Sequence, residues 1–361
     1  MKKIIYFSYH YPPDLSAGAI RSESIVKELL KQETNLKIWV FCSLPKRYNN
    51  LKFQKYIQSK HKNLKIIRFW IPFLGQNPLP SVVAYFFYFV QAIPLAILIR
   101  PQIIIGTSAK LLTSFVAACS AQLTRAKLYI DFRDTFSDNF FYFYRWHKRI
   151  ILQSFILTIE NIVLRRSNSI NMVSVGFKYA FSGWDKILEK YSISITNFTN
   201  GLNEDFRKKI KQQTFLKSKR KSQIYKIIYA GNLGEGQDIL SLIKNINENK
   251  KLLKKFNEYK ISFDIYGSGS QLKEINKLLS QDCFSNKINY CGLVPRNNIH
   301  KIYGEADCLM LHLANYLSLS LVIPSKIFEY TATPFPIIYS ANGFTRNFIE
   351  KIEGTIYFKQ G

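Results

Sequence analysis

Both halves of the chain repeat one local pattern: a short apolar run, a glycine-containing loop, and then a stretch with helical periodicity. In the first half, residues 3–8 form the apolar run, Gly18 lies in the loop, and residues 22–30 follow with a helical pattern. In the second half, residues 227–230 lead into Gly231 and Gly236. Apolar runs of this kind are typical of parallel strands that helices cover on both faces. The pattern therefore predicts the α/β class, with doubly wound sheets and ligand-binding loops at the carboxyl ends of the strands.

Further apolar runs extend each sheet. The runs of the first half are residues 36–42, 64–69, 103–106, 128–130 and 170–174, and those of the second half are 261–266, 288–292, 307–312 and 336–339. Between the halves, residues 208–226 are dense in Lys and Arg with few apolar positions. A chain of 361 residues can hold two domains with separate cores. We expect a first domain over residues 1–205, a basic linker over 206–226 and a second domain over 227–361.

The net charge of the chain limits the kinds of partner that it is expected to bind. The formal net charge is +27, which suits anionic lipid, an anionic substrate or nucleic acid. The sequence contains no helix-turn-helix, zinc-finger or RNA-binding motif, so we favour a membrane surface and an anionic substrate over nucleic acid. The five cysteines have no paired spacing, which argues against a disulfide framework or a metal site. We expect no metal.

Two apolar stretches bear on membrane contact. Residues 82–99 are apolar except for Gln91, and Pro94 interrupts them. Their length only reaches the lower limit for a membrane span, so a buried or interface-lying helix is the preferred interpretation. Residues 136–146 are rich in Phe and Tyr and could form an apolar lip that touches lipid.

The segment Ile323-Pro324-Ser325-Lys326-Ile327-Phe328-Glu329-Tyr330 is the strongest candidate for a ligand site. Proline favours the first turn of a helix, and a helix that starts there places Lys326 and Glu329 on one face. Such a helix start attracts anions, and Lys326 adds a charge for phosphate. Glu329 could accept hydrogen bonds from the hydroxyls of a ribose, so the pair suggests a nucleotide. The alternative is a surface helix with a single ion pair.

A second candidate lies at the end of the run over residues 128–130. Asp131, Arg133 and Asp134 follow this predicted strand, which is a position suited to catalysis. One carboxylate could orient or deprotonate an acceptor hydroxyl, while Arg133 fixes the loop or binds a phosphate. Alternatively, Arg133 pairs with a carboxylate only to shape the loop. His10 and Arg21, near Gly18, are further candidates on the same side.

The order and spacing of these motifs resemble the family 4 glycosyltransferases of the two-Rossmann-domain (GT-B) type, over nearly the whole chain. The similarity is greatest to bacterial enzymes that build O-antigen and capsular polysaccharide. The motifs that carry it are Tyr11-Pro12-Pro13-Asp14 with Gly18 and Arg21, Asp131-Phe132-Arg133-Asp134, Asn200-Gly201-Leu202, Tyr229-Ala230-Gly231-Asn232-Leu233-Gly234, Ile265-Tyr266-Gly267-Ser268-Gly269, and Leu311-His312-Leu313 with the segment around Lys326.

The resemblance implies two domains that face a central cleft, and it implies roles for matching residues. Lys326 would contact the donor diphosphate, Glu329 the ribose, and Gly18 would give a backbone N–H to the phosphate. Loops of the second domain would line the nucleotide and contribute Gly231, Asn232, Gly236, Gln237, Gly267, Ser268, Leu293 and His312. The resemblance further implies transfer with retention at the anomeric carbon, no cofactor besides the nucleotide-sugar co-substrate, and stabilisation of the leaving diphosphate without an obligatory metal.

The sequence departs from the family pattern at three places. Leu321 stands where many members have the first glutamate of a Glu-x7-Glu pair. Asn232, Gly236 and Gln237 stand in the loop where many members have Arg and Lys, so phosphate binding would depend more on Lys326. The chain ends at Gly361, just after a predicted strand, whereas the family normally continues with closing helices. We therefore expect an incomplete second domain.

The leading functional hypothesis is a transferase of the hexosyltransferase type that moves a sugar from a nucleotide-sugar to a polyprenyl-diphosphate-linked saccharide. It would act at the cytoplasmic face of the cell membrane as a peripheral protein. One alternative is a non-catalytic remnant that binds nucleotide-sugar. Another is an epimerase of the same fold, which would release an altered sugar without any acceptor.

Overall fold

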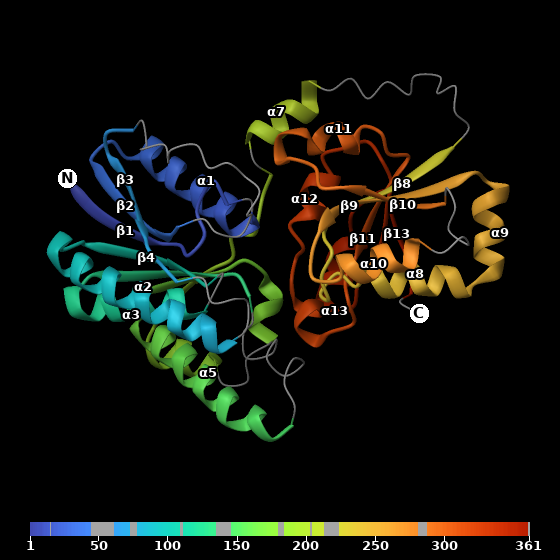
Figure 1. Ribbon diagram of the computed structural model, residues 1–361. Coiled ribbons are helices and arrows are strands. Elements are labelled where there is room, and N and C mark those ends of the chain that lie inside the picture. The colour runs from blue at the N-terminus through green and yellow to red at the C-terminus, as the bar shows by residue number, and fades with distance from the viewer. Residues whose placement is uncertain are drawn as a thin grey trace. The chain divides into compact units, whose positions relative to one another are not determined.

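Two parallel sheets, one in each of two units, form the framework of the protein (Figure 1). The units are Met1–Thr199 and Asn200–Gly361. The structure is a computed structural model that describes residues 1–14, 16–44, 61–72, 78–108, 111–134, 146–179, 184–202, 204–212, 224–280 and 287–359. Within these ranges, the side chains of residues 78–82, 146–153 and 184–186 are not described.

The first unit is built on a sheet with the strand order β3-β2-β1-β4-β5-β6-β7, all parallel. Its elements are β1 (Lys2–Phe7), α1 (Ala17–Gln32), β2 (Leu36–Ser43), β3 (Leu64–Phe69), α2 (Pro78–Ile99), β4 (Ile103–Thr107), α3 (Leu111–Thr124), β5 (Lys127–Phe132), α5 (Trp146–Arg166), β6 (Ser169–Met172), η1 (Val175–Tyr179), α6 (Trp184–Lys190) and β7 (Ser194–Thr196).

The alternation of side chains along β1 explains how helices cover both faces of this sheet. Tyr6 packs in the cluster that includes Val26 of α1. Its neighbour Phe7 points to the other face, where its ring meets Tyr88 of α2 edge-on at 6.5 Å. Successive strand residues point to opposite faces, so a strand covered on both sides must be apolar throughout. Helix α1 lies on one face, and α2, α3 and α5 pack together on the other (Figure 1).

The second unit is built on a parallel sheet with the strand order β10-β9-β8-β11-β12-β13. Its elements are α7 (Glu204–Gln212), β8 (Tyr225–Asn232), α8 (Ile239–Glu248), α9 (Lys250–Glu258), β9 (Ile261–Ser268), α10 (Leu272–Leu279), β10 (Ile288–Gly292), η3 (Arg296–Asn298), α11 (Ile299–Tyr303), β11 (Cys308–His312), η4 (Leu317–Leu321), α12 (Lys326–Tyr330), β12 (Ile337–Ser340), α13 (Gly343–Ile349) and β13 (Thr355–Tyr357). The predicted α/β class with two doubly wound sheets is confirmed.

The expected linker needs a correction at its beginning. Residues 206–212 belong to α7, and Phe206 and Ile210 are buried in the core of the second unit with Tyr303 and Tyr330. These two apolar residues, four positions apart, give α7 a buried face. Four of the nine residues between 204 and 212 are Lys or Arg, and this high share of basic residues made the segment resemble a linker rather than a helix with a buried face. In the remainder of the predicted linker, residues 213–223 lie outside the described residues, and residues 225 and 226 belong to β8.

Helix α2 has one buried face and one exposed apolar face. Tyr88 and Ala92 are fully buried, whereas Phe86, Val90 and Ile97 are 62%, 43% and 45% exposed. The helix runs through Pro94 without a break in its assignment. Among the residues that the structure describes, no helix has the length and apolar character needed to cross a membrane. The predicted aromatic lip spans residues 136–146, of which 136–145 lie outside the described residues and Trp146 begins α5.

Candidate functional site

The carboxyl edge of the second sheet brings together the loops that follow β8, β9 and β11, and helix α12 adjoins them. Helix α12 begins at Lys326, two residues after the predicted start at Pro324, and Ser325 is its N-cap residue. The shift is small because the backbone N–H of Ile327 already donates to the Pro324 carbonyl at 3.1 Å. This turn presents Lys326 to the end of β8.

Lys326 is part-buried, and its ammonium lies against Tyr229. Its Nζ donates to the Tyr229 hydroxyl at 2.9 Å and lies 4.0 Å from the centre of that ring. A Cβ atom on Gly231 would come within 1.8 Å of this Nζ, so only glycine leaves room for the lysine here. Burial lowers the pKa of Lys326 to about 7, and the Glu329 carboxylate opposes that shift. The alternative of a surface helix with a single ion pair does not fit this part-buried lysine.

Glu329 has partners other than Lys326. Its carboxylate accepts hydrogen bonds from Arg296 through Oε1 and from the Tyr303 hydroxyl through Oε2, the latter at 2.9 Å. Arg296 also lies over the ring of Phe206, 5.0 Å from its centre. These contacts, and not the ion pair with Lys326 that the alternative interpretation required, hold the Glu329 carboxylate at the end of α12.

Glycines allow the loops to approach one another at this edge. Gly267 has φ +141°, and a Cβ there would come within 1.8 Å of the Gly231 carbonyl oxygen. Both residues lie inside strands, β8 and β9, rather than in the loops that we expected. Ser268 ends β9 with an exposed side chain, and Leu293, just after β10, is 61% exposed.

The loop after β8 is held by contacts among the predicted donor residues. Asn232 Nδ2 donates to Gln237 Oε1 at 2.8 Å, and the Gly236 carbonyl accepts from the backbone of Ala314 at 3.0 Å. His312 Nδ1 lies 2.7 Å from the Gln237 carbonyl oxygen. Burial lowers the pKa of His312, so the ring is neutral, and Nδ1–H donates to that carbonyl. These contacts bring Asn232, Gly236, Gln237 and His312 together, and their roles as donor contacts stay predictions.

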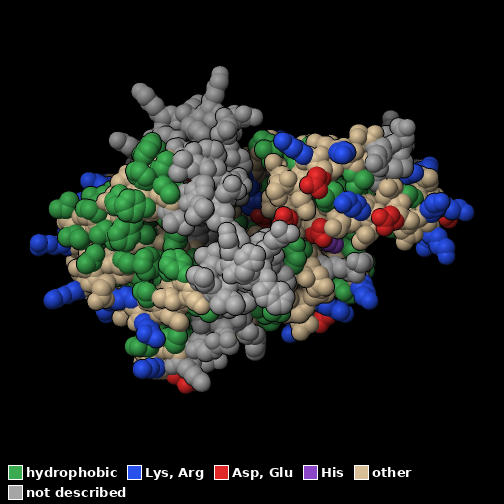
Figure 2. Space-filling view, turned by 60° about the horizontal axis from the view of Figure 1, so that its bottom comes forward, with side chains coloured by type: hydrophobic (Ala, Val, Ile, Leu, Met, Phe, Trp, Pro, Cys, Tyr) green, Lys and Arg blue, Asp and Glu red, His purple; other side chains and the backbone are tan. Residues whose placement is uncertain are grey.

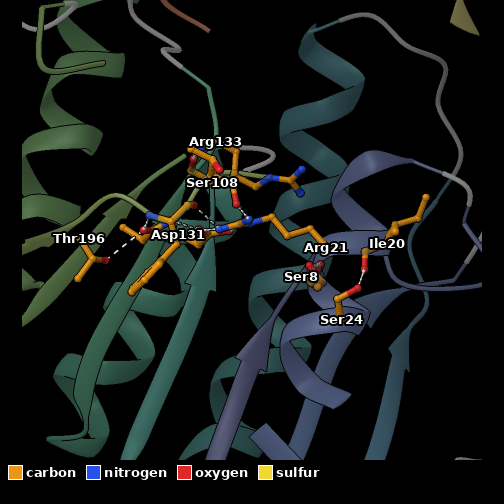
Figure 3. A network of polar contacts seen from close by, with 12 residues as sticks. Ser8, Ile20, Arg21, Ser24, Ser108, Asp131, Arg133 and Thr196 are labelled. Atoms are coloured by element: carbon orange, nitrogen blue, oxygen red, sulfur yellow. Dashed lines mark hydrogen bonds and ion pairs between the residues drawn. The ribbon is translucent and has the colours of Figure 1, made fainter. Parts of the chain in front are cut away.

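In the first unit, Asp131 lies within β5 and is 1% exposed. Its two oxygens accept from Arg21 Nε at 2.8 Å and Nη2 at 2.9 Å, and Oδ1 also accepts from Asn171 at 2.7 Å. Arg21 also donates to the carbonyls of Phe198 and Thr199. Figure 3 shows this network joining helix α1 to the sheet. Asp131 thus pairs with Arg21, 110 residues away, rather than with Arg133, the pairing that the alternative interpretation allowed.

Arg133 and Asp134 follow β5, and Arg133 lies beside this network (Figure 3). The backbone N–H of Arg133 donates to Ser108 Oγ at 2.9 Å. Its side-chain Nε and Nη1 are buried and have no hydrogen-bond partner among the described residues. Desolvation raises the pKa of Asp134 to about 6, and the neighbouring Arg133 cation partly offsets that shift. Among the described residues, Arg133 differs from Asp131 in keeping side-chain nitrogens without a hydrogen-bond partner.

The remaining predicted residues lie around the start of α1. Gly18 is in the first turn of α1, rather than in a preceding loop, because Ser16 caps the helix by accepting from the Ala19 N–H. His10 Nδ1 lies 3.3 Å from Asp14 Oδ2. Asp14 is buried, so His10 is tied to the loop after β1. Among the described residues, no group of three or more His, Cys, Asp or Glu side chains could hold a metal ion.

Comparison with known proteins identifies the second unit. Residues 208–360 match a family model described as "Glycosyl transferases group 1". The C-terminal unit is a group 1 glycosyltransferase domain. The chain is accordingly a glycosyltransferase. A search of the curated proteins found no matching sequence.

Solved structures of the same architecture match the chain over almost its full length. Anabaena HepE in complex with UDP and glucose has a TM-score of 0.63 at 11% identity, over 100% of this chain and 86% of that chain. The trehalose 6-phosphate synthase of Burkholderia multivorans has 0.64 at 9%, over 99% and 85%. WaaG, a glycosyltransferase involved in lipopolysaccharide biosynthesis, has 0.60 at 9%, over 99% and 86%. At these identities the likeness shows the fold, which is GT-B with two Rossmann-like units.

Sequence reasoning missed several residues that the structure brings to these edges. Tyr229 binds Lys326, Arg296 and Tyr303 bind Glu329, and Asn171 binds Asp131. Tyr229 stands two residues before Gly231, so it would share that glycine's face of the strand, and this was the one available signal. The others come from distant segments with no common spacing.

Proposed function

We propose that the protein is a retaining glycosyltransferase that transfers a sugar from a nucleotide-sugar donor to a lipid-linked saccharide. The proposed binding of the donor is supported by the position of Lys326, which lies at the carboxyl edge of the second sheet next to Tyr229 and Gly231. Ligands of α/β folds bind at such edges. HepE and WaaG share the fold, HepE has been solved with UDP and with UDP-glucose, and WaaG is involved in lipopolysaccharide biosynthesis.

In this proposal Lys326 compensates the charge of the donor diphosphate as the bond to the sugar breaks. An ammonium carries three N–H groups, and the Tyr229 hydroxyl takes one of them, so two remain for phosphate oxygens. In many enzymes, stabilising the charge that develops in the transition state contributes most to the rate enhancement. Glu329, fixed by Arg296 and Tyr303, would accept hydrogen bonds from the ribose hydroxyls. Gly18 would donate its backbone N–H to the phosphate.

On the acceptor side, we propose roles for Asp134 and Arg133 rather than for Asp131. Asp131 already accepts three hydrogen bonds from Arg21 and Asn171. Asp134 has a raised pKa of about 6, which suits a general base near neutral pH. Two nitrogens of Arg133 have no hydrogen-bond partner within the described part of the chain, and they suit a phosphate of the acceptor. His10 would line the same edge of the first unit.

We also propose that the protein attaches to the cytoplasmic face of a membrane through the exposed face of α2. Phe86, Val90 and Ile97 lie on one side of that helix. Figure 2 shows hydrophobic side chains gathered on a face of the first unit, with Lys and Arg at its margin. Arg100 and Arg125, which directly follow α2 and α3, would face anionic headgroups. A role in bacterial O-antigen or capsule biosynthesis would follow from a polyprenyl-linked acceptor.

The experiment is a transfer assay with a panel of UDP-, GDP-, ADP- and dTDP-sugars and a polyprenyl-diphosphate-linked sugar. The expected result is an elongated lipid-linked saccharide, made only with acceptor present, with the donor's anomeric configuration kept in the NMR spectrum. A soluble sugar phosphate as acceptor forms a second arm, because trehalose 6-phosphate synthase shares the fold. Transfer in that arm alone would replace the lipid-linked acceptor in the proposal. Altered sugar released without any acceptor would make the protein an epimerase, and binding without turnover would make it a non-catalytic remnant.

A further inference from the structure

Tyr229 joins two segments at the carboxyl edge of the second sheet. Its side chain is fully buried, and its hydroxyl donates to the Asn232 carbonyl at 2.6 Å. The same oxygen accepts from Lys326 Nζ at 2.9 Å. Because a hydroxyl has one proton to donate, its bond to Asn232 fixes which way the oxygen lone pairs point. They point at the ammonium of Lys326.

Lys326 depends on this hydroxyl more than an exposed lysine would. Among the described residues, the Tyr229 hydroxyl is the hydrogen-bond acceptor that the structure gives to its Nζ. The ring of Tyr229 adds a second contact, since the ammonium lies 4.0 Å from the ring centre and is attracted by the π electrons. Both contacts stabilise the charged ammonium more than the neutral amine.

The opposing influence on Lys326 is desolvation. Burial lowers its pKa to about 7, so the group titrates near neutral pH. The charged group that faces it is Glu329 of its own helix, which Arg296 of η3 neutralises in part. Tyr229 of β8 and Tyr303 of α11 stay neutral, because burial raises their pKa values well above the ordinary range. The charge of Lys326 is thus decided by a few neighbours, of which Tyr229 is the nearest.

We propose that Tyr229 is a positioning residue for sugar transfer, which keeps the Lys326 side chain charged and placed above Gly231 for the donor diphosphate. This inference rests on the proposed donor role of Lys326. The simpler alternative is that Tyr229 is an ordinary core tyrosine whose hydroxyl only satisfies the Asn232 carbonyl. The two interpretations differ in the pH dependence of donor binding, which a purely structural tyrosine would leave unchanged.

The test uses the full chain and measures binding of the tightest nucleotide-sugar from the panel by calorimetry, from slightly acidic to moderately alkaline pH. The phosphates of a nucleotide-sugar bear no proton that titrates near neutral pH, so the protein dominates the profile. In the parent, affinity should fall as pH rises through about 7, where the ammonium of the free protein loses its proton. In Tyr229→Phe, affinity at neutral pH should fall about tenfold, as expected for one hydrogen bond to a charged group, and the decline should begin at lower pH.

Tyr330→Phe is the matched control. Tyr330 is also fully buried in the second unit, and its hydroxyl donates to the Met310 carbonyl at 3.2 Å. This variant loses a hydroxyl and a hydrogen bond to a backbone carbonyl, as Tyr229→Phe does, but it should keep the parent's affinity and pH profile. Thermal unfolding of both variants separates any loss of stability from the change in binding.

The variant Lys326→Met tests the donor role of Lys326 independently of the positioning role of Tyr229. If Lys326 binds the diphosphate, this variant should lose affinity and show no fall in binding near pH 7. Parent-like binding by Lys326→Met would overturn the donor role itself. If Lys326→Met behaves as expected but Tyr229→Phe keeps the parent's affinity and pH midpoint, the inference about Tyr229 is wrong while the proposed function stands. A change in Tyr330→Phe equal to that in Tyr229→Phe would also overturn the inference.

Discussion

Asp131 in the first unit and Lys326 in the second are both charged residues withdrawn from solvent near the carboxyl edge of a sheet, but their surroundings differ. Asp131 is 1% exposed and accepts three hydrogen bonds, two of them from the Arg21 guanidinium. Within the described ranges, Lys326 donates to a single neutral hydroxyl, and its pKa is lowered to about 7. A buried charge with a full set of partners belongs to the architecture. A charge with one neutral partner keeps bonding capacity for a ligand.

The same contrast separates residues within the first unit. Asp131 and Asp134 are three positions apart, and both looked equally suited to catalysis in the sequence. Asp131 is held by Arg21 and Asn171, whereas Asp134 has a pKa raised to about 6. A substitution at Asp134 should therefore lower the transfer rate, whereas one at Asp131 should lower the stability of the fold. Measuring both properties in both variants tests this contrast.

The largest effect is expected for Asp134→Asn. If Asp134 is the general base, the substitution should lower kcat by about 10²–10⁴, with donor affinity unchanged. In the parent, the carboxylate form is required, so kcat should fall as pH drops below about 6. Steady-state transfer rates across pH check both points. A rate for Asp134→Asn within a few-fold of the parent would remove this residue from the mechanism.

Asp131→Asn should instead destabilise the fold. It leaves the Arg21 guanidinium buried without its counter-charge, and breaking such a pair costs about 3–5 kcal/mol of unfolding free energy. Denaturant unfolding measures the loss, and Glu28→Gln, on the exposed side of α1, is the control that should change little. The transfer rate per folded molecule should stay within a few-fold. A stable but inactive Asp131→Asn would reverse the assignment of roles.

Gly231→Ala and Gly267→Ala should separate an effect on donor binding from an effect on stability within the second unit. The Cβ at position 231 meets the flexible end of Lys326, so the lysine can move aside and the donor should bind about 1–3 kcal/mol more weakly. The Cβ at position 267 meets the Gly231 carbonyl, and φ is +141°, so the fold should lose about 1–3 kcal/mol or more. Calorimetry and thermal unfolding should show opposite patterns for the two variants. Equal loss of stability in both would contradict the account of Gly231.

The smallest effect concerns the surface of the first unit. Arg100→Gln, directly after α2, should weaken binding to vesicles that contain phosphatidylglycerol by about 1 kcal/mol, and added salt should reduce the difference. Vesicle flotation measures the bound fraction, and Lys273→Gln, exposed on α10 of the second unit, is the control. Equal losses in both variants would show that net charge, and not the face of α2, attracts the membrane.

The sheets were predictable from the sequence because both faces of each are covered. Runs such as residues 36–42 and 103–106 fall within β2 and β4, whose residues are almost all buried, since a strand packed on both sides has few polar positions. Helix α7 was missed because its two buried residues, Phe206 and Ile210, are surrounded by lysines and acidic residues. Gly18 was assigned to a loop because the capping role of Ser16 was overlooked.

The candidate site was predictable only in part. Strand ends and glycines indicated which loops would meet, and the contacts of Asn232 with Gln237 and of Gln237 with His312 agree with that grouping. The partners of each charge were not predictable, because Arg21 and Asp131, or Arg296 and Glu329, come from distant segments. Pairing over such separations is decided by topology, which spacing in the sequence does not record.

The central claim is that Lys326 binds the diphosphate of a nucleotide-sugar, and a crystal structure of the full chain with its tightest-binding nucleotide-sugar tests it most directly. The account predicts that Lys326 Nζ lies about 2.7–2.9 Å from a diphosphate oxygen, the distance of a charge-assisted hydrogen bond, while still contacting the Tyr229 hydroxyl. Glu329 should contact the ribose. A nucleotide bound elsewhere, or one bound at this edge with Lys326 out of reach of its phosphates, would contradict the claim.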